Sequence, residues 1–138
     1  MDMTVMTHSV PTILIADDNP DVRGMLRAFF SDYDCELVEA TNGEEAIENV
    51  IIEQPDLVVL DVMMPEVNGW EVCRYIKERD TLRDIRVIML TGIGHNLNAM
   101  TSPLYGADAY LDKPFDLDQL EATVLELLGA DGISRNPG

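Results

Sequence analysis

Three aspartates stand directly after two short apolar runs of this sequence. Asp17 and Asp18 follow the run ILIA, and Asp61 follows the run LVVL. Carboxylates packed together repel one another unless a cation neutralises them. Carboxylate oxygens are ligands that Mg²⁺ prefers, and Mg²⁺ in proteins usually also contacts a phosphate oxygen. The three aspartates therefore predict a magnesium site in which one carboxylate is free to act as a nucleophile.

Two further residues extend this chemistry to phosphoryl transfer. The chain has only two lysines among its nine basic residues, and one of them, Lys113, follows another apolar run. Its compact ammonium group suits a phosphoryl oxygen, and the hydroxyl of Thr91, beside the small Gly92, can donate to a second oxygen. Together these side chains match aspartyl phosphorylation, in which a carboxylate attacks phosphorus while cationic and hydroxyl groups hold the charge of the phosphoryl oxygens.

Each of these residues also has a purely structural explanation. Asp18 can cap the helix that follows it, Asp61 can begin a turn, and Thr91 can simply end a strand. Taken singly, such explanations are at least as good as the chemical one. The coincidence of all three with Lys113 favours the chemical interpretation.

The elements that must position these side chains begin with five predicted strands. Continuous apolar runs without polar alternation are typical of strands that are buried on both faces. Three runs have this character, and two weaker ones complete the set. The strong strands are Ile13–Ala16, Leu57–Leu60 and Val87–Leu90, and the weaker strands are Glu36–Ala40 and Ala109–Leu111.

The segments between the strands carry apolar residues at helical spacing, which predicts one buried stripe for each helix. The first stripe comprises Val22, Met25, Leu26 and Phe29, and the second comprises Ala46, Ile47, Val50 and Ile51. The third comprises Val72, Cys73 and Ile76, and the last comprises Leu117, Leu120, Val124 and Leu127 or Leu128.

Capping signals predict where these helices begin. An N-cap residue accepts a hydrogen bond from the first turn, and an acid or amide three residues later can return the bond as a capping box. The predicted signals are Asn19 with Pro20, Thr41 with Glu44, Asn68 with Gly69, and Asp116 with Gln119.

Strand and helix thus alternate five times along the chain. Right-handed crossovers convert this alternation into a doubly wound α/β domain, a five-stranded parallel sheet with five helices on its two faces. Function in such sheets collects at the carboxyl ends of the strands. The aspartates, Thr91 and Lys113 all follow strand ends, so we expect them to meet at one edge.

Composition bounds the remaining possibilities. The 138 residues suit one domain, expected over residues 12–128, with flexible segments at 1–11 and 129–138. The net charge of −17 disfavours direct contact with nucleic acid, and no run approaches the ~20 apolar residues that cross a bilayer. Cys35 and Cys73 lie in hydrophobic runs and are expected to be reduced, so the predicted location is cytoplasmic.

The motifs in this order resemble the receiver domain of response regulators over nearly all of residues 12–128. The matching segments are ILIADDN, LVVLDVMMP with NGWE, VIMLTG, and GADAYLDKPF. Each segment alone is a weak signal, but together, in this order and at strand ends, they are highly specific. The resemblance implies a flavodoxin-like (βα)5 fold with strand order 2-1-3-4-5.

The resemblance also implies a role for each site residue. It marks Asp61 as the phosphoacceptor, Asp17 and Asp18 as metal-binding acids, and Thr91 as the switch hydroxyl. Lys113 would contact the phosphoryl group and precede a cis-proline. Tyr110 would be the switch aromatic, and the backbone carbonyl of Met63 would be the third protein ligand to Mg²⁺. Tyr110 could equally be a packed aromatic of an edge strand.

The function implied by the resemblance is a phosphorylation-controlled switch rather than an enzyme with a turnover substrate. A sensor histidine kinase or phosphotransfer protein would supply the phosphoryl group. A downstream protein partner would bind the face formed by the fourth helix, the fifth strand and the fifth helix. The fourth helix, expected within residues 96–105, contains Pro103 and few strong helix formers, so we expect it to be short or broken.

Three alternatives stay open at this stage. If the chain is complete, we expect it to act as a single-domain regulator; otherwise it is the receiver module of a longer protein. An Asp-nucleophile phosphohydrolase needs similar groups, but such enzymes typically place a second acid two residues after the nucleophile, where this chain has Met63. The third alternative is a docking domain that keeps the fold and is never phosphorylated.

Overall fold

The computed structural model describes residues 10–92 and 106–136, and it contains one five-stranded parallel sheet in the order β2-β1-β3-β4-β5. This order and the doubly wound α/β architecture confirm the sequence-based prediction. The strands are β1 (Thr12–Ala16), β2 (Glu36–Ala40), β3 (Leu57–Asp61), β4 (Arg86–Thr91) and β5 (Ala109–Asp112). The helices in the described residues are α1 (Pro20–Phe30), α2 (Gly43–Glu53), α3 (Gly69–Lys77) and α5 (Leu117–Leu128).

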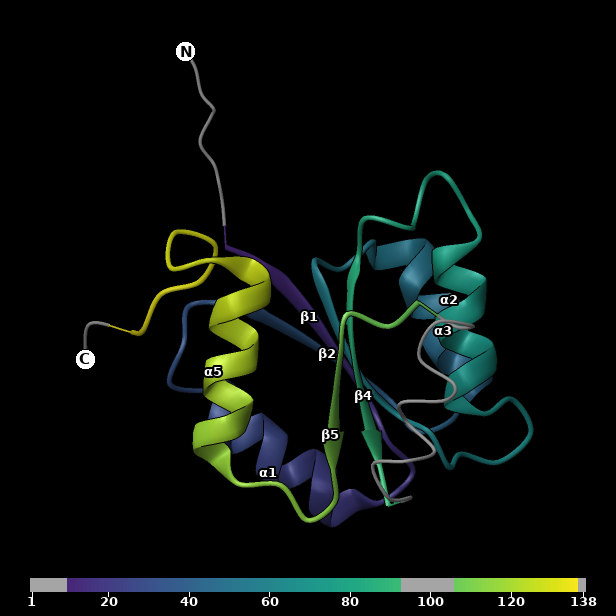
Figure 1. Cartoon of the computed structure of the whole chain (residues 1–138), viewed down its shortest axis with the longest axis horizontal. Coiled ribbons are helices and arrows are strands. Elements are labelled where there is room, and N and C mark those ends of the chain that lie inside the picture. Colours follow the sequence, from purple (N-terminus) through teal and green to yellow (C-terminus); the bar gives the residue numbers. More distant parts are fainter. Residues whose placement is uncertain (1–9, 93–105, 137–138) are drawn as a thin grey trace.

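The helices form a layer on each face of the sheet (Figure 1). Helices α1 and α5 cover one face, and α2 and α3 cover the other. The predicted fourth helix, expected within 96–105, lies outside the described residues. Within the described part of the chain, no helix has the length and apolar character needed to cross a membrane.

Successive residues of β1 point to opposite faces of the sheet and pack alternately into the two hydrophobic cores. Ile13 and Ile15 pack with α1 and α5, whereas Leu14 and Ala16 pack with α2 and α3. All five residues of β3 are buried, as expected for a strand with helices on both faces. The continuous apolar runs of the sequence therefore reflect two cores that share one sheet.

Three of the predicted helix starts are confirmed, and one is displaced. Asn19 caps α1, and capping boxes at Asn68 and Asp116 begin α3 and α5. For α2 the prediction of Thr41 with Glu44 is wrong. Asn42 is the N-cap and accepts from the Glu45 amide at 2.8 Å, while the Glu45 carboxylate accepts from the amide and hydroxyl of Thr41. Asparagine is the stronger cap of the two adjacent candidates, which explains the one-residue shift.

The predicted apolar stripes are correct at their centres and wrong at their margins. Met25, Ile51 and Leu117 were expected in the core, but their exposed fractions are 37%, 49% and 45%. In α1 the buried pair is Leu26 and Phe30, so the packed face is rotated by a fraction of a turn from the predicted one. A stripe several residues wide cannot fix the rotation of a helix more closely than this.

The described part of the predicted flexible tail is packed against the domain. Ile133 is only 3% exposed and belongs to the core beneath α1 and α5. Two main-chain hydrogen bonds join this segment to the loop after α1, from Asp34 N to Ser134 O and from Asn136 N to Asp32 O, both at 2.8 Å. The part of this segment that the structure describes therefore contacts the domain through both its core and its main chain.

Side chains reinforce the same contact. Arg135 forms an ion pair with Glu121 on α5, and the Tyr33 hydroxyl donates a hydrogen bond to the same carboxylate. The Arg135 guanidinium also lies 5.1 Å from the centre of the Tyr33 ring. The segment that follows α5 thus contacts both the first half of this helix and the loop after α1.

Replacing Ile133 tests whether this segment stabilises the domain. Because its side chain fills the core, Ile133→Ala is expected to lower the free energy of unfolding by about 2–5 kcal/mol. Ile52→Ala is the control, because Ile52 is 73% exposed and should change stability by less than about 0.5 kcal/mol. Urea unfolding followed by circular dichroism measures both variants, and equal midpoints would show that the tail adds no stability.

Candidate functional site

The carboxylates of Asp17, Asp18 and Asp61 lie together at the carboxyl edge of the sheet. One oxygen from each lies within 4.8 Å of the others. Strand pairing accounts for this proximity, because β1 and β3 are neighbours and Ala16 stands opposite Leu60. The next residues, Asp17 and Asp61, therefore leave adjacent strands at the same height. The predicted convergence of these acids is what the structure shows.

Burial strengthens the repulsion between the carboxylates of this cluster. Asp17 is fully buried, Asp61 is 3% exposed, and Asp18 is exposed. Burial is the main cause that raises the pKa of Asp61 to about 6, and the carboxylate of Asp17 is the second cause. The nearby Lys113 acts in the opposite direction. Three carboxylates therefore share a pocket in which one ammonium group does not fully offset their charge. A hard divalent cation with oxygen ligands fits this donor set and its negative charge.

Lys113 connects two of the three acids. Its Nζ lies 3.0 Å from Asp17 Oδ2 and 3.2 Å from Asp61 Oδ1, so it donates to both carboxylates. Burial alone would lower the pKa of Lys113, but the two carboxylates outweigh this effect and raise the pKa above its usual value. The Lys113–Pro114 peptide is cis, as the resemblance implied.

Thr91 is fully buried at the end of β4, between the strands that carry Asp61 and Lys113. Its carbonyl accepts a hydrogen bond of 2.7 Å from the Lys113 amide. A Cβ added at the adjacent Gly92 would meet no atom of the described residues within 4 Å other than those of its chain neighbours. The main chains of Thr91 and Lys113 are therefore joined directly.

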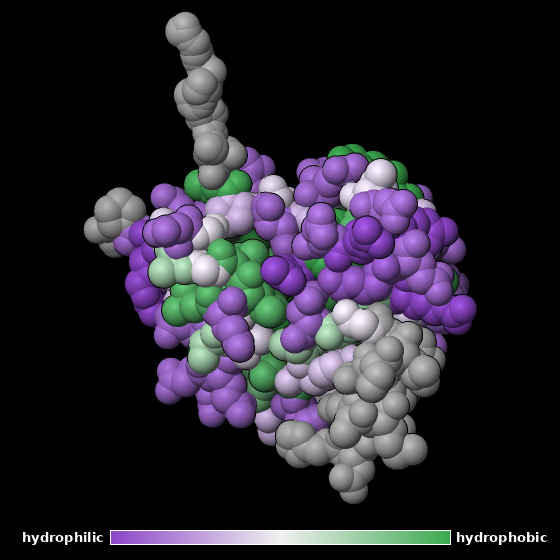
Figure 2. Space-filling model, turned by 45° about the horizontal axis from the view of Figure 1, so that its top comes forward, coloured by the Kyte–Doolittle hydropathy of each residue, from purple (hydrophilic) through white to green (hydrophobic). Residues whose placement is uncertain are grey.

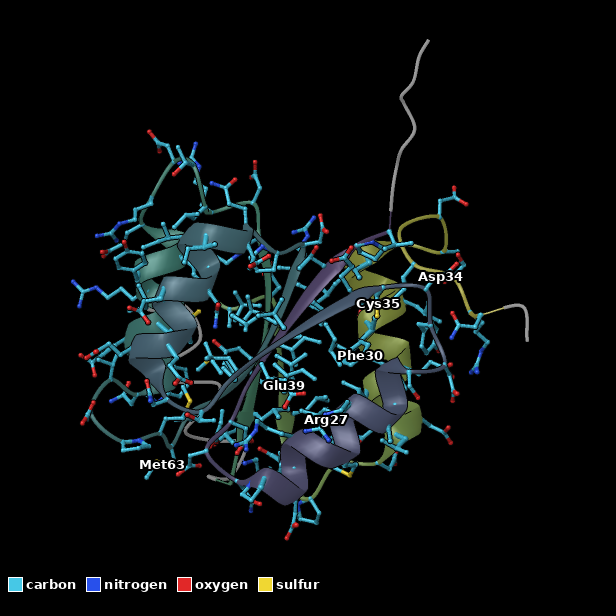
Figure 3. The ribbon with its side chains drawn as sticks, turned by 180° about the vertical axis from the view of Figure 1, so that it is seen from behind. Arg27, Phe30, Asp34, Cys35, Glu39 and Met63 are labelled. Atoms are coloured by element: carbon cyan, nitrogen blue, oxygen red, sulfur yellow. The ribbon has the colours of Figure 1, made fainter. Side chains whose placement is uncertain are left out.

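Met63 approaches the site through its main chain. Its amide donates to Asp61 Oδ1 at 3.2 Å, while its side chain is 65% exposed. Figure 3 shows Met63 on the outer loop that follows β3, at the rim of the domain. The apolar side chain of Met63 therefore does not prevent its backbone from taking part in the site.

Gly69 is a site residue whose role the sequence did not reveal. A Cβ built on Gly69 would lie 2.2 Å from the carbonyl oxygen of Asp61, a distance that real Cβ atoms do not show. The Gly69 amide also donates to Val62 O at 2.9 Å. The first turn of α3 therefore packs directly on the backbone of Asp61, and only glycine permits this approach.

Tyr110 lies on the edge strand β5 and packs with the core on the α2 and α3 side. Its ring centre is 6.1 Å from that of Trp70, in the first turn of α3. This contact is compatible both with a switch aromatic and with a packed edge aromatic. It places Tyr110 beside the helix that begins against Asp61.

Comparison with known proteins agrees with the fold and the site. The sequence matches the response regulator receiver domain family over residues 13–125. The chain belongs to this family, whose members are signalling proteins of two-component systems rather than classical enzymes. The predicted family is thereby confirmed, and the acidic pocket fits both Mg²⁺ and an aspartyl phosphate.

Individual relatives show how much of each protein the similarity covers. The probable transcriptional regulator ycf27 of Porphyra purpurea is 38% identical over 134 residues, which are 96% of this chain and 54% of that protein. The DNA-binding dual master transcriptional regulator RpaA of Synechocystis is 34% identical over 119 residues, which are 86% and 49% of the two proteins. The chain thus spans about half the length of these curated relatives.

A solved structure covers a similar part of the chain. The chemotaxis protein CheY4 of Vibrio cholerae superposes with a TM-score of 0.80 at 25% identity. The match includes 87% of this chain and 100% of that one. The similarity therefore concerns the whole described domain rather than one motif.

Gly69→Ala tests the close packing of α3 on Asp61. The added methyl group must push α3 or the Asp61 backbone aside, so we expect a loss of about 1–3 kcal/mol of stability. The control is Gly24→Ala in α1, where the new Cβ meets only Arg27 Nη1 at 3.9 Å. This control should gain about 0.5–1 kcal/mol from helix propensity. Similar unfolding midpoints for the two variants would contradict the packing described.

Proposed function

We propose that this chain is a phosphorylation-controlled switch that accepts a phosphoryl group on Asp61. The observation that carries the proposal is the position of Lys113 Nζ, which donates to both Asp17 and Asp61 in a buried acidic pocket. An ion pair that only stabilises the fold can form at the surface and requires a single acid. Lys113 instead contacts two acids that are both buried. A sensor histidine kinase or a phosphotransfer protein is the proposed donor.

The proposed reaction uses the chain's own groups in separate roles. A carboxylate oxygen of Asp61 attacks the phosphorus of a phosphohistidine, the P–N bond breaks, and the histidine leaves with the bond's electron pair. Lys113 and the hydroxyl of Thr91 then hold the charge of the phosphoryl oxygens. Slow hydrolysis of the acyl phosphate by water returns Asp61, so the chain catalyses only its own modification and its reversal.

The proposed metal site comprises the carboxylates of Asp17, Asp18 and Asp61 and the backbone carbonyl of Met63. Bound Mg²⁺ would supply positive charge that offsets both the clustered carboxylates and the phosphoryl oxygens. Asp17 is held by hydrogen bonds from the chain itself, with its Oδ1 accepting from the Asn19 amide at 2.9 Å and its Oδ2 from Lys113 Nζ at 3.0 Å.

The proposed switch follows from the link between Lys113 and Thr91. A phosphoryl group on Asp61 competes for the Lys113 ammonium and for the Thr91 hydroxyl, and the two residues share a main-chain hydrogen bond. A displacement of either residue therefore acts on both β4 and β5. Tyr110 is three residues before Lys113 on β5, so its contact with Trp70 is the proposed site at which the change reaches the surface.

The proposed output surface includes β5 and α5; the fourth helix, also expected to belong to it, lies within residues 96–105, outside the described residues. Seven acids follow Val87, against only Lys113 and Arg135. Leu117 and Leu125 on α5 are 45% and 36% exposed, and Figure 2 shows hydrophobic residues surrounded by hydrophilic ones on the face that carries this helix. We therefore infer a protein partner whose surface is basic or apolar.

Direct contact between this domain and nucleic acid is not part of the proposal. The net charge of −17 opposes the approach of a phosphate backbone. One relative, RpaA of Synechocystis, is a DNA-binding transcriptional regulator, but the similarity covers only 49% of that protein. We propose that this receiver domain acts by protein contact in the cytoplasm.

Two other functions have less support. A phosphohydrolase would place an acid near the position of Met63, whose exposed thioether cannot transfer a proton. A docking domain without phosphorylation would not need Asp17 and Asp61 buried together against their mutual repulsion. A docking domain would also not need the two contacts of Lys113 with these acids.

Incubation with acetyl phosphate and Mg²⁺ tests the proposed phosphoacceptor. Intact-mass spectrometry is expected to show one phosphoryl adduct on the wild type, none on Asp61→Asn, and none when EDTA removes the metal. Asp21→Asn is the control, because Asp21 is an exposed acid in the first turn of α1, and it should be modified like the wild type. An adduct on Asp61→Asn at the wild-type level would overturn the assignment.

A further inference from the structure

Arg23 reaches from α1 to the backbone of the acidic pocket. Its Nη1 donates a hydrogen bond of 2.8 Å to the main-chain carbonyl of Asp17. The Arg23 side chain is 16% exposed, so most of it is withdrawn from water. The contact is directed at the peptide group and therefore differs from an ion pair with the Asp17 carboxylate.

The other side of the Arg23 guanidinium faces an anchored acid. Its Nε lies 3.5 Å from Oε1 of Glu39, on β2. Arg27 donates two hydrogen bonds to the same carboxylate, from Nε at 2.7 Å and from Nη2 at 3.0 Å, and Figure 3 shows Arg27 and Glu39 facing each other between α1 and β2. The hydrogen bond from Arg27 is the main cause that lowers the pKa of Glu39. Glu39 is therefore an ionised acid that faces both arginines, and Arg27 makes the shorter contacts with it.

The hydrogen bond from Arg23 fixes the main-chain carbonyl of Asp17, which the other hydrogen bonds of Asp17 described here do not involve. The Asp17 amide donates to Ala40 O at 3.2 Å, and its carboxylate accepts from the Asn19 amide and from Lys113. Its carbonyl belongs to the planar peptide group that continues into Asp18. Whatever fixes the direction of this carbonyl also sets the direction in which the Asp18 backbone starts.

We propose that Arg23 is a positioning residue for the acidic pocket. By holding the peptide group between Asp17 and Asp18, it directs the exposed Asp18 carboxylate toward the two buried acids. Arg23 acts through its hydrogen bond to the main-chain carbonyl of Asp17, and not through an ion pair with one of the three carboxylates. This inference rests on the proposed function, because it concerns the site that is proposed to bind Mg²⁺.

Magnesium titration of three variants tests this role. Groups that orient metal ligands from the second layer typically contribute 10–100-fold to affinity, so Arg23→Gln is expected to weaken Mg²⁺ binding by about that factor. Arg23→Lys should fall between this variant and the wild type, because an ammonium can reach the carbonyl but lacks the planar fork that also faces Glu39. Arg27→Gln is the matched control, which loses bonds to Glu39 and leaves the contact with Asp17 in place.

A second measurement needs no metal. The Asn19 amide is bonded to Asp17 Oδ1, so its hydrogen exchange reports the order of the loop in the apo protein. Exchange at Asn19 should accelerate in Arg23→Gln and remain close to the wild-type rate in Arg27→Gln. Urea unfolding shows whether each variant is folded. If Arg23→Gln is not folded, the comparison of Arg23→Lys with the wild type tests the role of Arg23.

The outcomes separate the inference from the proposed function. A wild-type protein that fails to bind Mg²⁺ would refute the proposed site itself. Wild-type binding with unchanged affinity and unchanged Asn19 exchange in Arg23→Gln would overturn the role of Arg23. Equal losses in Arg23→Gln and Arg27→Gln would also overturn it, because the effect would then belong to the contacts between α1 and β2 in general.

Discussion

One ammonium group shared by two buried carboxylates is the interaction on which this structure depends. Asp17 and Asp61 are withdrawn from water, and each would repel the other without the Nζ of Lys113 at 3.0 and 3.2 Å. The three residues come from the ends of β1, β3 and β5, and β4 lies between the last two. The long, flexible stem of lysine spans this distance. The order of the strands and the chemistry of the site are therefore parts of the same arrangement.

The fold was largely predictable because its signals are local or periodic. Buried strands such as Leu57–Asp61 need a continuous apolar run, and the caps at Asn19 and Asp116 act within one helical turn. The error at the start of α2 arose where two local solutions compete, at Thr41 and Asn42. Contacts between distant segments have no such local signal; Asn136 Nδ2, for example, donates to Ser31 O across 105 positions of the sequence.

The candidate site divides in the same way. The convergence of Asp17, Asp18 and Asp61 follows from parallel topology, because the carboxyl ends of adjacent strands meet. The supporting contacts of Gly69 and Arg23 do not follow from topology, since one is a steric approach to a carbonyl and the other a side chain that returns to the backbone. A glycine at the start of a helix and an arginine on a mixed helix face are too common to signal such roles.

The most direct test of the account compares the phosphorylated wild type with phosphorylated Lys113→Ala, after intact-mass spectrometry has confirmed that Asp61 is modified in both. Hydrogen exchange in β5 (Ala109–Asp112) is the measured quantity, with the unphosphorylated proteins as references. If Lys113 transmits the change, phosphorylation alters exchange in β5 of the wild type and leaves the variant unchanged. The same change in phosphorylated Lys113→Ala, or no change in the wild type, would contradict the account.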